Sequence, residues 1–326
     1  MKPAFSVIFL TTLIGAAQGL FLALFTAQSY ALFNLLPVQS SQSFYAVGTL
    51  LVLVLSALGL FSSFFHLGRP ERAWRSAAMW RTSWLSREVI VLPAFMGVAG
   101  LYGLAHFTGW NPTLLTLGGG IVIDASVVLG VLGTVLAFAL FVTTGMVYAC
   151  MRFMQEWHSP LTVINYILLG GASGFTLAAA FANHGAPALV RFFTFWALII
   201  TLLACASRCA SLLRNKRLRP TSTLQTAIGI KHPRIVQKSM GFMGGSFNTR
   251  EFFHGQSRAT LASVKWVFLA TVFALPMLLL ATSLWAATPG VLAIAFVVQY
   301  LGLLAERWFF FAQANHPQNL YYQAVA

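Results

Sequence analysis

The stretch that decides the fold of this chain is Phe65-His66-Leu67-Gly68-Arg69-Pro70-Glu71-Arg72, which continues to Ser86-Arg87-Glu88. It is polar and basic, and it separates two long apolar runs. We call residues 65–88 the hinge. Because the run on either side is long enough to cross a bilayer, the sequence predicts a membrane protein that presents this hinge at one edge of the membrane.

The composition is that of an integral membrane protein. The chain has 326 residues, of which 58% are hydrophobic and only 8% are charged, whereas a soluble domain has about 25% charged residues. Several apolar runs reach the roughly 20 residues that a helix needs to span the hydrocarbon core. The alternating pattern of an outer-membrane barrel does not occur. We therefore predict an all-α integral membrane protein.

Eight membrane spans can be drawn, and we expect them to form a single membrane domain over residues 1–326. The first run resembles a cleaved signal peptide, but its apolar character continues through Leu20 to Phe25, too far for such a peptide. We therefore interpret it as the first span. The expected spans are 5–28, 44–65, 88–107, 121–150, 161–183, 190–213, 264–285 and 290–311.

The positive charges predict the orientation of the chain. If the N-terminus is inside, 19 of the 20 Lys and Arg residues lie on the inner side and only Arg191 lies outside. Cytoplasmic loops carry such an excess, so we predict that both termini are cytoplasmic and that the chain lies in the inner (cytoplasmic) membrane. The net charge of +14 then needs no nucleic acid to explain it. The long basic loop 214–263, between spans six and seven, suits either a partner subunit or the lipid surface.

Acidic residues are rare, with only six in the whole chain, and two of them are the main candidates for a site. Glu88 opens the third span, and Glu306 lies near the end of the eighth. A carboxyl group at membrane depth is costly unless it is paired, protonated or facing a wet cavity, so each is a candidate functional group. The predicted topology places His66, Tyr148 and Arg152 at the same inner edge. One amphiphilic site there would explain all five residues.

His66 and Glu88 are the chief candidates for this site. An imidazole donates hydrogen bonds and exchanges protons near neutral pH, and a carboxyl group carries protons to and from water. Such groups suit the exchange of two protons with a quinone or quinol. Structural alternatives remain open at each position: His66 as a helix cap, Glu88 paired with Arg87, Arg152 or Arg307, and Glu306 paired with Arg307.

The histidines and cysteines argue against a metal cofactor in this chain. A b-type haem needs two axial histidines that face each other inside the bundle, but all seven histidines lie at predicted helix ends or in loops. The three cysteines form no iron–sulfur or other metal pattern. A Walker loop and a Rossmann fingerprint are also missing. We therefore predict no haem, iron–sulfur cluster or other metal here, and electron carriers that belong to partner subunits.

The hinge resembles that of a known family. The segments His66-Leu67-Gly68-Arg69-Pro70, Arg72-Ala73 and Ser86-Arg87-Glu88 are similar to the hinge of the DmsC family. Members of this family are the membrane anchor subunits of dimethyl sulfoxide reductase and related molybdenum oxidoreductases. Residues 148–162 and 306–323 are most similar to the branch that anchors cytoplasm-facing sulfite dehydrogenases.

The resemblance implies a haem-free anchor that exchanges electrons with quinone, either ubiquinone or menaquinone. Such an anchor holds an iron–sulfur electron-transfer subunit and a molybdopterin catalytic subunit at the membrane. The family's quinol-site histidine and glutamate fall on His66 and Glu88. Arg69 and Arg87 depart from the small or neutral residues of dimethyl sulfoxide reductase anchors. The substrate of the complex and its quinone type therefore stay open.

Other functions compete with the sulfite version, in which electrons enter the quinone pool. The anchor of a dimethyl sulfoxide reductase would instead oxidise menaquinol. A proton-coupled secondary transporter would use Glu88 and Glu306 as proton carriers, but it would place polar groups and broken helices near the bilayer midplane. Here the polar groups gather at one edge, and Gly170-Gly171 and Gly118-Gly119-Gly120 are the candidate breaks. A purely structural anchor without a quinone site is the last alternative.

Overall fold

The computed structural model describes residues 1–118, 121–238, 251–285 and 290–321. Within these ranges, eight helices are long and apolar enough to cross a membrane, which confirms the predicted number of spans. They are α1 (Phe5–Leu32), the Ser41–His66 span that contains α2 (Val47–Ser63), α3 (Trp84–Thr108), α4 (Ala125–Ala149), α5 (Pro160–Gly185), α6 (Val190–Lys216), the Arg258–Trp285 span that contains α9 (Arg258–Leu269) and α10 (Leu275–Trp285), and α11 (Val291–Ala312).

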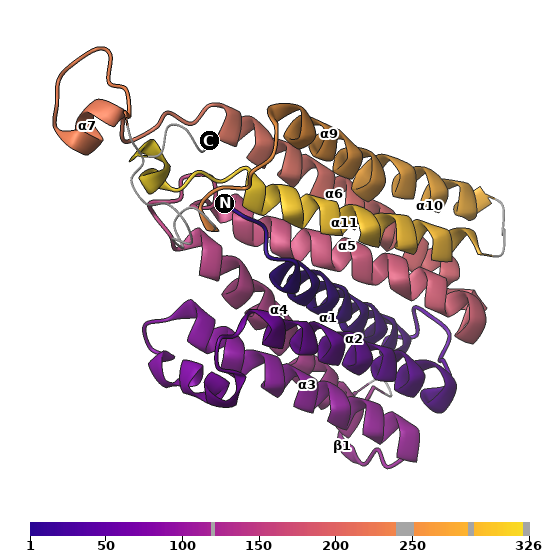
Figure 1. Cartoon of the computed structure of the whole chain (residues 1–326). Coiled ribbons are helices and arrows are strands. Elements are labelled where there is room, and N and C mark those ends of the chain that lie inside the picture. The colour runs from indigo at the N-terminus through magenta and orange to yellow at the C-terminus, as the bar shows by residue number, and fades with distance from the viewer. Residues whose placement is uncertain (119–120, 239–250, 286–289, 322–326) are drawn as a thin grey trace.

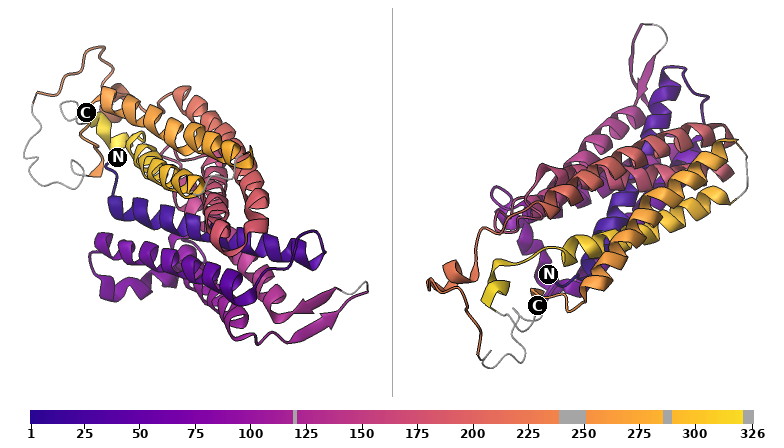
Figure 2. Two further views of the ribbon diagram at one scale, coloured as in Figure 1. Left: turned by 90° about the vertical axis from the view of Figure 1, so that its right-hand side faces the viewer. Right: turned by 90° about the horizontal axis from the view of Figure 1, so that it is seen from above.

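Several span boundaries differ from the predicted ones, among them the end of α1 at Leu32 and the start of α3 at Trp84, and two further differences change the architecture. The fourth span was expected from residue 121, but α4 begins at Ala125 because Val122–Asp124 (β2) pairs antiparallel with Thr113–Thr116 (β1). The predominantly helical chain thus also carries a short hairpin outside the bundle (Figure 2). The seventh span begins at Arg258 rather than at residue 264, so helical structure takes up both ends of the predicted loop 214–263. Between them lies the short helix α7 (Leu224–Ile228).

The helices form two neighbouring groups that meet along α1. Helices α1 to α4 lie on one side of the bundle, and α5, α6 and α9 to α11 lie on the other (Figure 1). Glycines bring α1 and α5 together, because a Cβ atom on Gly174 would overlap the backbone of Gly19. Small residues permit such close approach between helices in a membrane.

The two candidate helix breaks have different outcomes. Helix α5 runs unbroken through Gly170-Gly171, so this glycine pair serves packing and is not a helix break. The second candidate, Gly118-Gly119-Gly120, follows the strand β1 outside the bundle, and its last two residues lie outside the described ranges. Neither Gly170-Gly171 nor Gly118, the one described residue of the second candidate, interrupts a membrane span.

One end of the bundle collects the basic residues, and we call it the basic end. It carries the hinge, the ends of α4, α6 and α11, the N-terminus as Figure 1 marks it, and Pro317–Tyr321, the last described segment. The Met1 ammonium group donates a hydrogen bond to the Ala314 carbonyl over 2.7 Å, which ties the N-terminal segment to the segment after α11. Of the described Lys and Arg residues, Arg191 alone belongs to the opposite end, so the charge asymmetry expected from the sequence exists in the fold.

Candidate functional site

Glu88 lies in the second turn of α3, just inside the basic end. Helix α3 begins at Trp84 because the side chain of Ser83, the residue before it, accepts a hydrogen bond from the Ser86 backbone N–H and so caps the helix. Glu88 is partly buried, and its Oε1 accepts a hydrogen bond of 2.7 Å from the Thr144 hydroxyl of α4. The Arg87 guanidinium instead donates to the carbonyls of Trp80 and Arg81 in the hinge. The carboxyl group of Glu88 is therefore held by a neutral partner.

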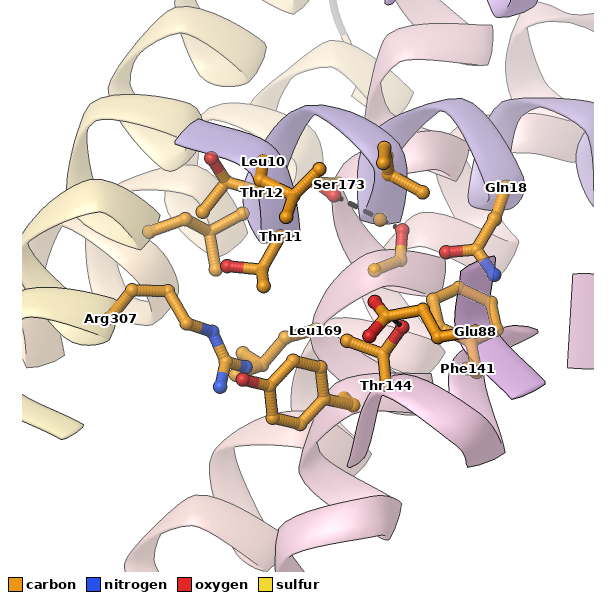
Figure 3. A pocket seen from close by; sticks show the side chains of 15 residues that line it. Leu10, Thr11, Thr12, Gln18, Glu88, Phe141, Thr144, Leu169, Ser173 and Arg307 are labelled. Atoms are coloured by element: carbon orange, nitrogen blue, oxygen red, sulfur yellow. Dashed lines mark hydrogen bonds between the residues drawn. The ribbon is translucent and has the colours of Figure 1, made fainter. Parts of the chain in front are cut away.

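A small polar cavity lies beside Glu88, enclosed between helices of the bundle. Its volume of ≈ 20 Å³ leaves room for about one water molecule. Glu88 and Thr144 lie on one side of it and Arg307 on the other (Figure 3). The cavity is lined by residues of α1, α3, α4, α5 and α11, and its polar lining residues are Thr11, Thr12, Gln18, Glu88, Thr144, Tyr166, Ser173 and Arg307.

On the far side of this cavity lies a buried group of three charged side chains, which we call the Glu306 triad. Glu306 Oε1 pairs with Arg208 Nε at 2.7 Å, and Glu306 Oε2 pairs with Arg307 Nε at 3.2 Å. All three side chains are at most 4% exposed. The Arg307 guanidinium also lies over the Tyr166 ring, 3.9 Å from its centroid. Because the triad contains two cations and one anion, it carries a net positive charge inside the membrane, which is costly and marks a functional candidate.

The cavity and the triad together form a polar layer across the bundle, in which the cavity lies between Glu88 and Arg307. It runs from Glu88 on α3 through Thr144 on α4 and Tyr166 on α5 to the triad on α11 and α6. The structural alternative for Glu306, a pair with Arg307, is present, and Arg208 adds a second partner.

The other predicted site residues lie outside this cavity. Tyr148 belongs to an aromatic cluster and stacks on Tyr166 with ring centroids 5.8 Å apart. Arg152 is exposed in the loop after α4. His66 is exposed at the end of the second span, at the same end of the bundle as Glu88, and it is not among the cavity's lining residues. The expected cleft between His66 and Glu88 is therefore not this cavity, and the pairing stays a prediction.

Three residues of the polar layer did not stand out in the sequence. For Arg208 a signal was available in the sequence, because an arginine inside the predicted span 190–213 is energetically costly unless it is paired. Thr144 and Tyr166 carried no comparable signal, since hydroxyl-bearing residues are common in membrane helices and only the packing shows which of them face a carboxyl group. Within the described residues, no group of three or more His, Cys, Asp or Glu side chains could hold a metal ion.

The hinge presents tryptophan and arginine side chains at the basic end. Its central part is the 3-10 helix Pro70–Met79, which has no buried residue. Three arginine–tryptophan pairs follow one another along the hinge. The distances from guanidinium to ring are 5.5 Å for Arg75 over Trp74, 5.4 Å for Arg81 over Trp80, and 4.2 Å for Arg87 over Trp84. Tryptophan and arginine favour membrane interfaces and protein interfaces alike.

Comparison with known proteins agrees with the resemblance seen in the hinge. The family model described as "DMSO reductase anchor subunit (DmsC)" matches residues 1–314. A curated relative, a sulfite dehydrogenase subunit of Allochromatium vinosum, is 57% identical over 326 residues, which cover 100% of both chains. These matches include the hinge, the cavity and the Glu306 triad.

Proposed function

This chain belongs to the DmsC family of membrane anchor subunits, and we propose that it anchors a molybdopterin oxidoreductase complex and reduces quinone with electrons from sulfite. It carries no haem and holds an iron–sulfur subunit, which passes electrons from the molybdopterin subunit to the quinone. The observation that carries this proposal is the end-to-end similarity to a sulfite dehydrogenase subunit, at 57% identity.

The chain's own contribution to the reaction is the handling of protons. Reduction of a quinone to a quinol consumes two electrons and two protons. The electrons come from the partner's iron–sulfur cluster, and the protons come from water at the basic end. Glu88 suits the transfer of these protons because it lies one turn inside that end and is only partly buried. The Thr144 hydroxyl holds one carboxyl oxygen, Oε1, and leaves Oε2 available.

The quinone ring must approach from the lipid side. Pockets for small organic ligands have volumes of about 300–1,000 Å³, whereas the cavity beside Glu88 measures only ≈ 20 Å³. That cavity suits a proton-carrying water molecule and excludes a ring. His66 is exposed at the edge of the second span, where its imidazole is free to donate a hydrogen bond to a quinone carbonyl. We assign His66 to quinone binding and Glu88 to proton transfer.

The basic end is the side on which the partner subunits dock. We expect this end, and both termini with it, to face the cytoplasm, because cytoplasmic segments of membrane proteins carry an excess of Lys and Arg. The hinge and the loop after α6 offer exposed basic and aromatic side chains to an iron–sulfur subunit. Docking at this end brings the partner's nearest cluster close to His66 and Glu88.

The Glu88→Gln variant of the purified complex tests the proposal. We expect sulfite-dependent reduction of a soluble ubiquinone analogue to fall about 100-fold, because a positioned proton-transfer group contributes at least that much. Sulfite-dependent reduction of ferricyanide, which draws electrons from the partner subunits, should stay unchanged. Thr144→Val should give a smaller loss of the same kind.

The matched control is Glu71→Gln, because Glu71 is an exposed carboxylate of the same hinge and pairs only loosely with Arg72 at 3.8 Å. It should leave both activities unchanged. Equal quinone reduction by the Glu88→Gln and wild-type complexes would remove Glu88 from the reaction. A complex that oxidises menaquinol with dimethyl sulfoxide, and that does not oxidise sulfite, would replace the proposed function with the reductase alternative.

A further inference from the structure

A groove opens on the side of the bundle between α6, α9 and α11, at the basic end and away from Glu88. Its volume is ≈ 650 Å³, which is in the range of a pocket for a sizeable organic ligand. We call the apolar lining residues of this groove its walls and the polar lining residues its mouth. The groove is lined by Leu212, Leu213, Trp266, Leu269, Phe309 and Cys209 along the walls and by Glu156, Asn215, Lys216, Lys265, Gln313 and Asn315 around the mouth.

Two lysines at the mouth have no acidic partner. Among the described residues, no carboxylate lies within ion-pair distance of Lys216 or Lys265. The one acidic residue of the lining, Glu156, instead accepts a hydrogen bond of 3.2 Å from the Asn315 side chain. Gln313 adds a buried amide nitrogen that finds no hydrogen-bond acceptor in the described part of the chain. The mouth therefore offers three donors to an anion.

The apolar walls continue onto the lipid-facing surface. Leu213 is 58% exposed and Trp266 is 66% exposed, as expected for side chains that contact acyl chains at the edge of a bilayer. Lys265 lies seven residues after the start of α9 at Arg258, about 10 Å along the helix axis at 1.5 Å per residue. Its aliphatic stem can therefore lie against the apolar wall while the ammonium group reaches the interface.

We propose that this groove binds an anionic glycerophospholipid. The phosphate lies between Lys216 and Lys265 and accepts a hydrogen bond from Gln313, and one acyl chain follows Leu213, Leu269 and Trp266. A zwitterionic lipid supplies the same chains but also places a cation near the two lysines, so it binds more weakly. The lipid fills the space between α6 and α9, and the groove shares no lining residue with the cavity beside Glu88.

The test measures lipid binding to the purified full-length complex in mild detergent by native mass spectrometry. The probes are palmitoyl-oleoyl phosphatidylglycerol, the matching phosphatidylcholine, and inorganic phosphate. We expect phosphatidylglycerol to bind at least tenfold more tightly than phosphatidylcholine, and phosphate alone not to bind. The Lys216→Gln/Lys265→Gln double variant should lose about 25-fold in phosphatidylglycerol affinity, about fivefold for each lysine.

The matched control is Arg234→Gln/Lys238→Gln, which removes the same charge from an exposed segment of the same end, outside the groove. Its phosphatidylglycerol affinity should stay within twofold of wild type. Leu213→Ala should weaken both lipids equally, because it shortens the apolar wall and leaves the two lysines in place. Equal losses in the two double variants, or equal affinity for the two lipids, would overturn the proposal. So would loss of the partner subunits from the Lys216→Gln/Lys265→Gln variant with unchanged lipid binding, because the groove would then be a protein interface.

Discussion

Two polar clusters lie at opposite ends of the bundle, and they are built in different ways. The Asp124 cluster, at the end with the hairpin, is a chain of hydrogen bonds. Tyr102 donates to Gln28 over 2.8 Å, Gln28 donates to Ser126 over 2.6 Å, and Ser126 donates to Asp124 over 2.8 Å. Asn111 donates to the other oxygen of Asp124. In this series each side chain donates a hydrogen bond to the next one, and Asp124 also caps α4.

The polar layer at the basic end contains more charge and is less completely paired. Its triad holds two guanidinium groups against one carboxylate, and Arg208 Nη2 finds no hydrogen-bond partner among the described residues. A water-sized cavity separates the triad from Glu88. Fully satisfied networks stabilise a fold, whereas a carboxyl group beside a water-sized cavity, such as that of Glu88, can exchange protons with water. The contrast fits a structural role for the Asp124 cluster and the proposed role of Glu88 in proton transfer.

The largest expected effect on stability is that of Glu306→Gln. This variant leaves two buried arginines facing a neutral amide, and breaking a buried ion pair on one side costs about 3–5 kcal/mol. The measurement is the free energy of unfolding in mixed detergent micelles. The double variant Arg208→Gln/Glu306→Gln should recover part of the loss, because it removes one of the stranded charges. A loss below about 1 kcal/mol for Glu306→Gln would mean that the triad is not buried as described.

A smaller effect is expected from Asp124→Ala at the opposite end. This variant removes the cap of α4, whose Val127 N–H donates to Asp124 over 3.0 Å, and such a loss costs about 0.5–2 kcal/mol. Asp124→Asn is the matched control, because asparagine caps helices about as well as aspartate. Quinone reduction should stay unchanged in both variants. A loss of quinone reduction in Asp124→Asn would contradict the structural role of this cluster.

The smallest effect concerns His316, just after α11 at the basic end. Its ring stacks on Phe252 with centroids 3.8 Å apart, and burial lowers its pKa below the usual 6.5, so the folded state favours the neutral ring. As the pH falls, the unfolded segment therefore binds a proton at a higher pH than the folded segment does. Proton binding to the unfolded state favours unfolding, so the stability contributed by His316 is lost as the pH falls below 6.5. Amide hydrogen exchange over residues 317–321 should quicken at pH 5 relative to pH 7.

The control for this effect is His316→Phe, which keeps an aromatic ring against Phe252 and removes the titrating group. Exchange over residues 317–321 should then depend on pH only through the chemistry of the amides themselves. The same extra acceleration at pH 5 in His316→Phe would assign the effect to another group.

Much of the architecture could be predicted from the chain alone, and the misses have physical causes. The number of spans and the position of the hinge follow from apolar runs of about 20 residues and from local charge. The start of α4 was placed too early because the apolar residues Val122 and Ile123 suit a strand as well as a helix, and only pairing with Thr113–Thr116 decides between them. The position of Glu88 within a predicted membrane span makes it a candidate from the sequence alone. That its partner is Thr144 follows only from the way α3 packs against α4.

The sequence by itself determined that this chain is a helical membrane protein with one strongly basic end, because hydrophobicity and charge are properties of each segment. Only the tertiary structure decided that Glu306 pairs with Arg208 on a different helix and that Glu88 faces a water-sized cavity. These pairings depend on the rotation and spacing of the helices, which glycine contacts such as that of Gly19 with Gly174 set across segments far apart in the chain.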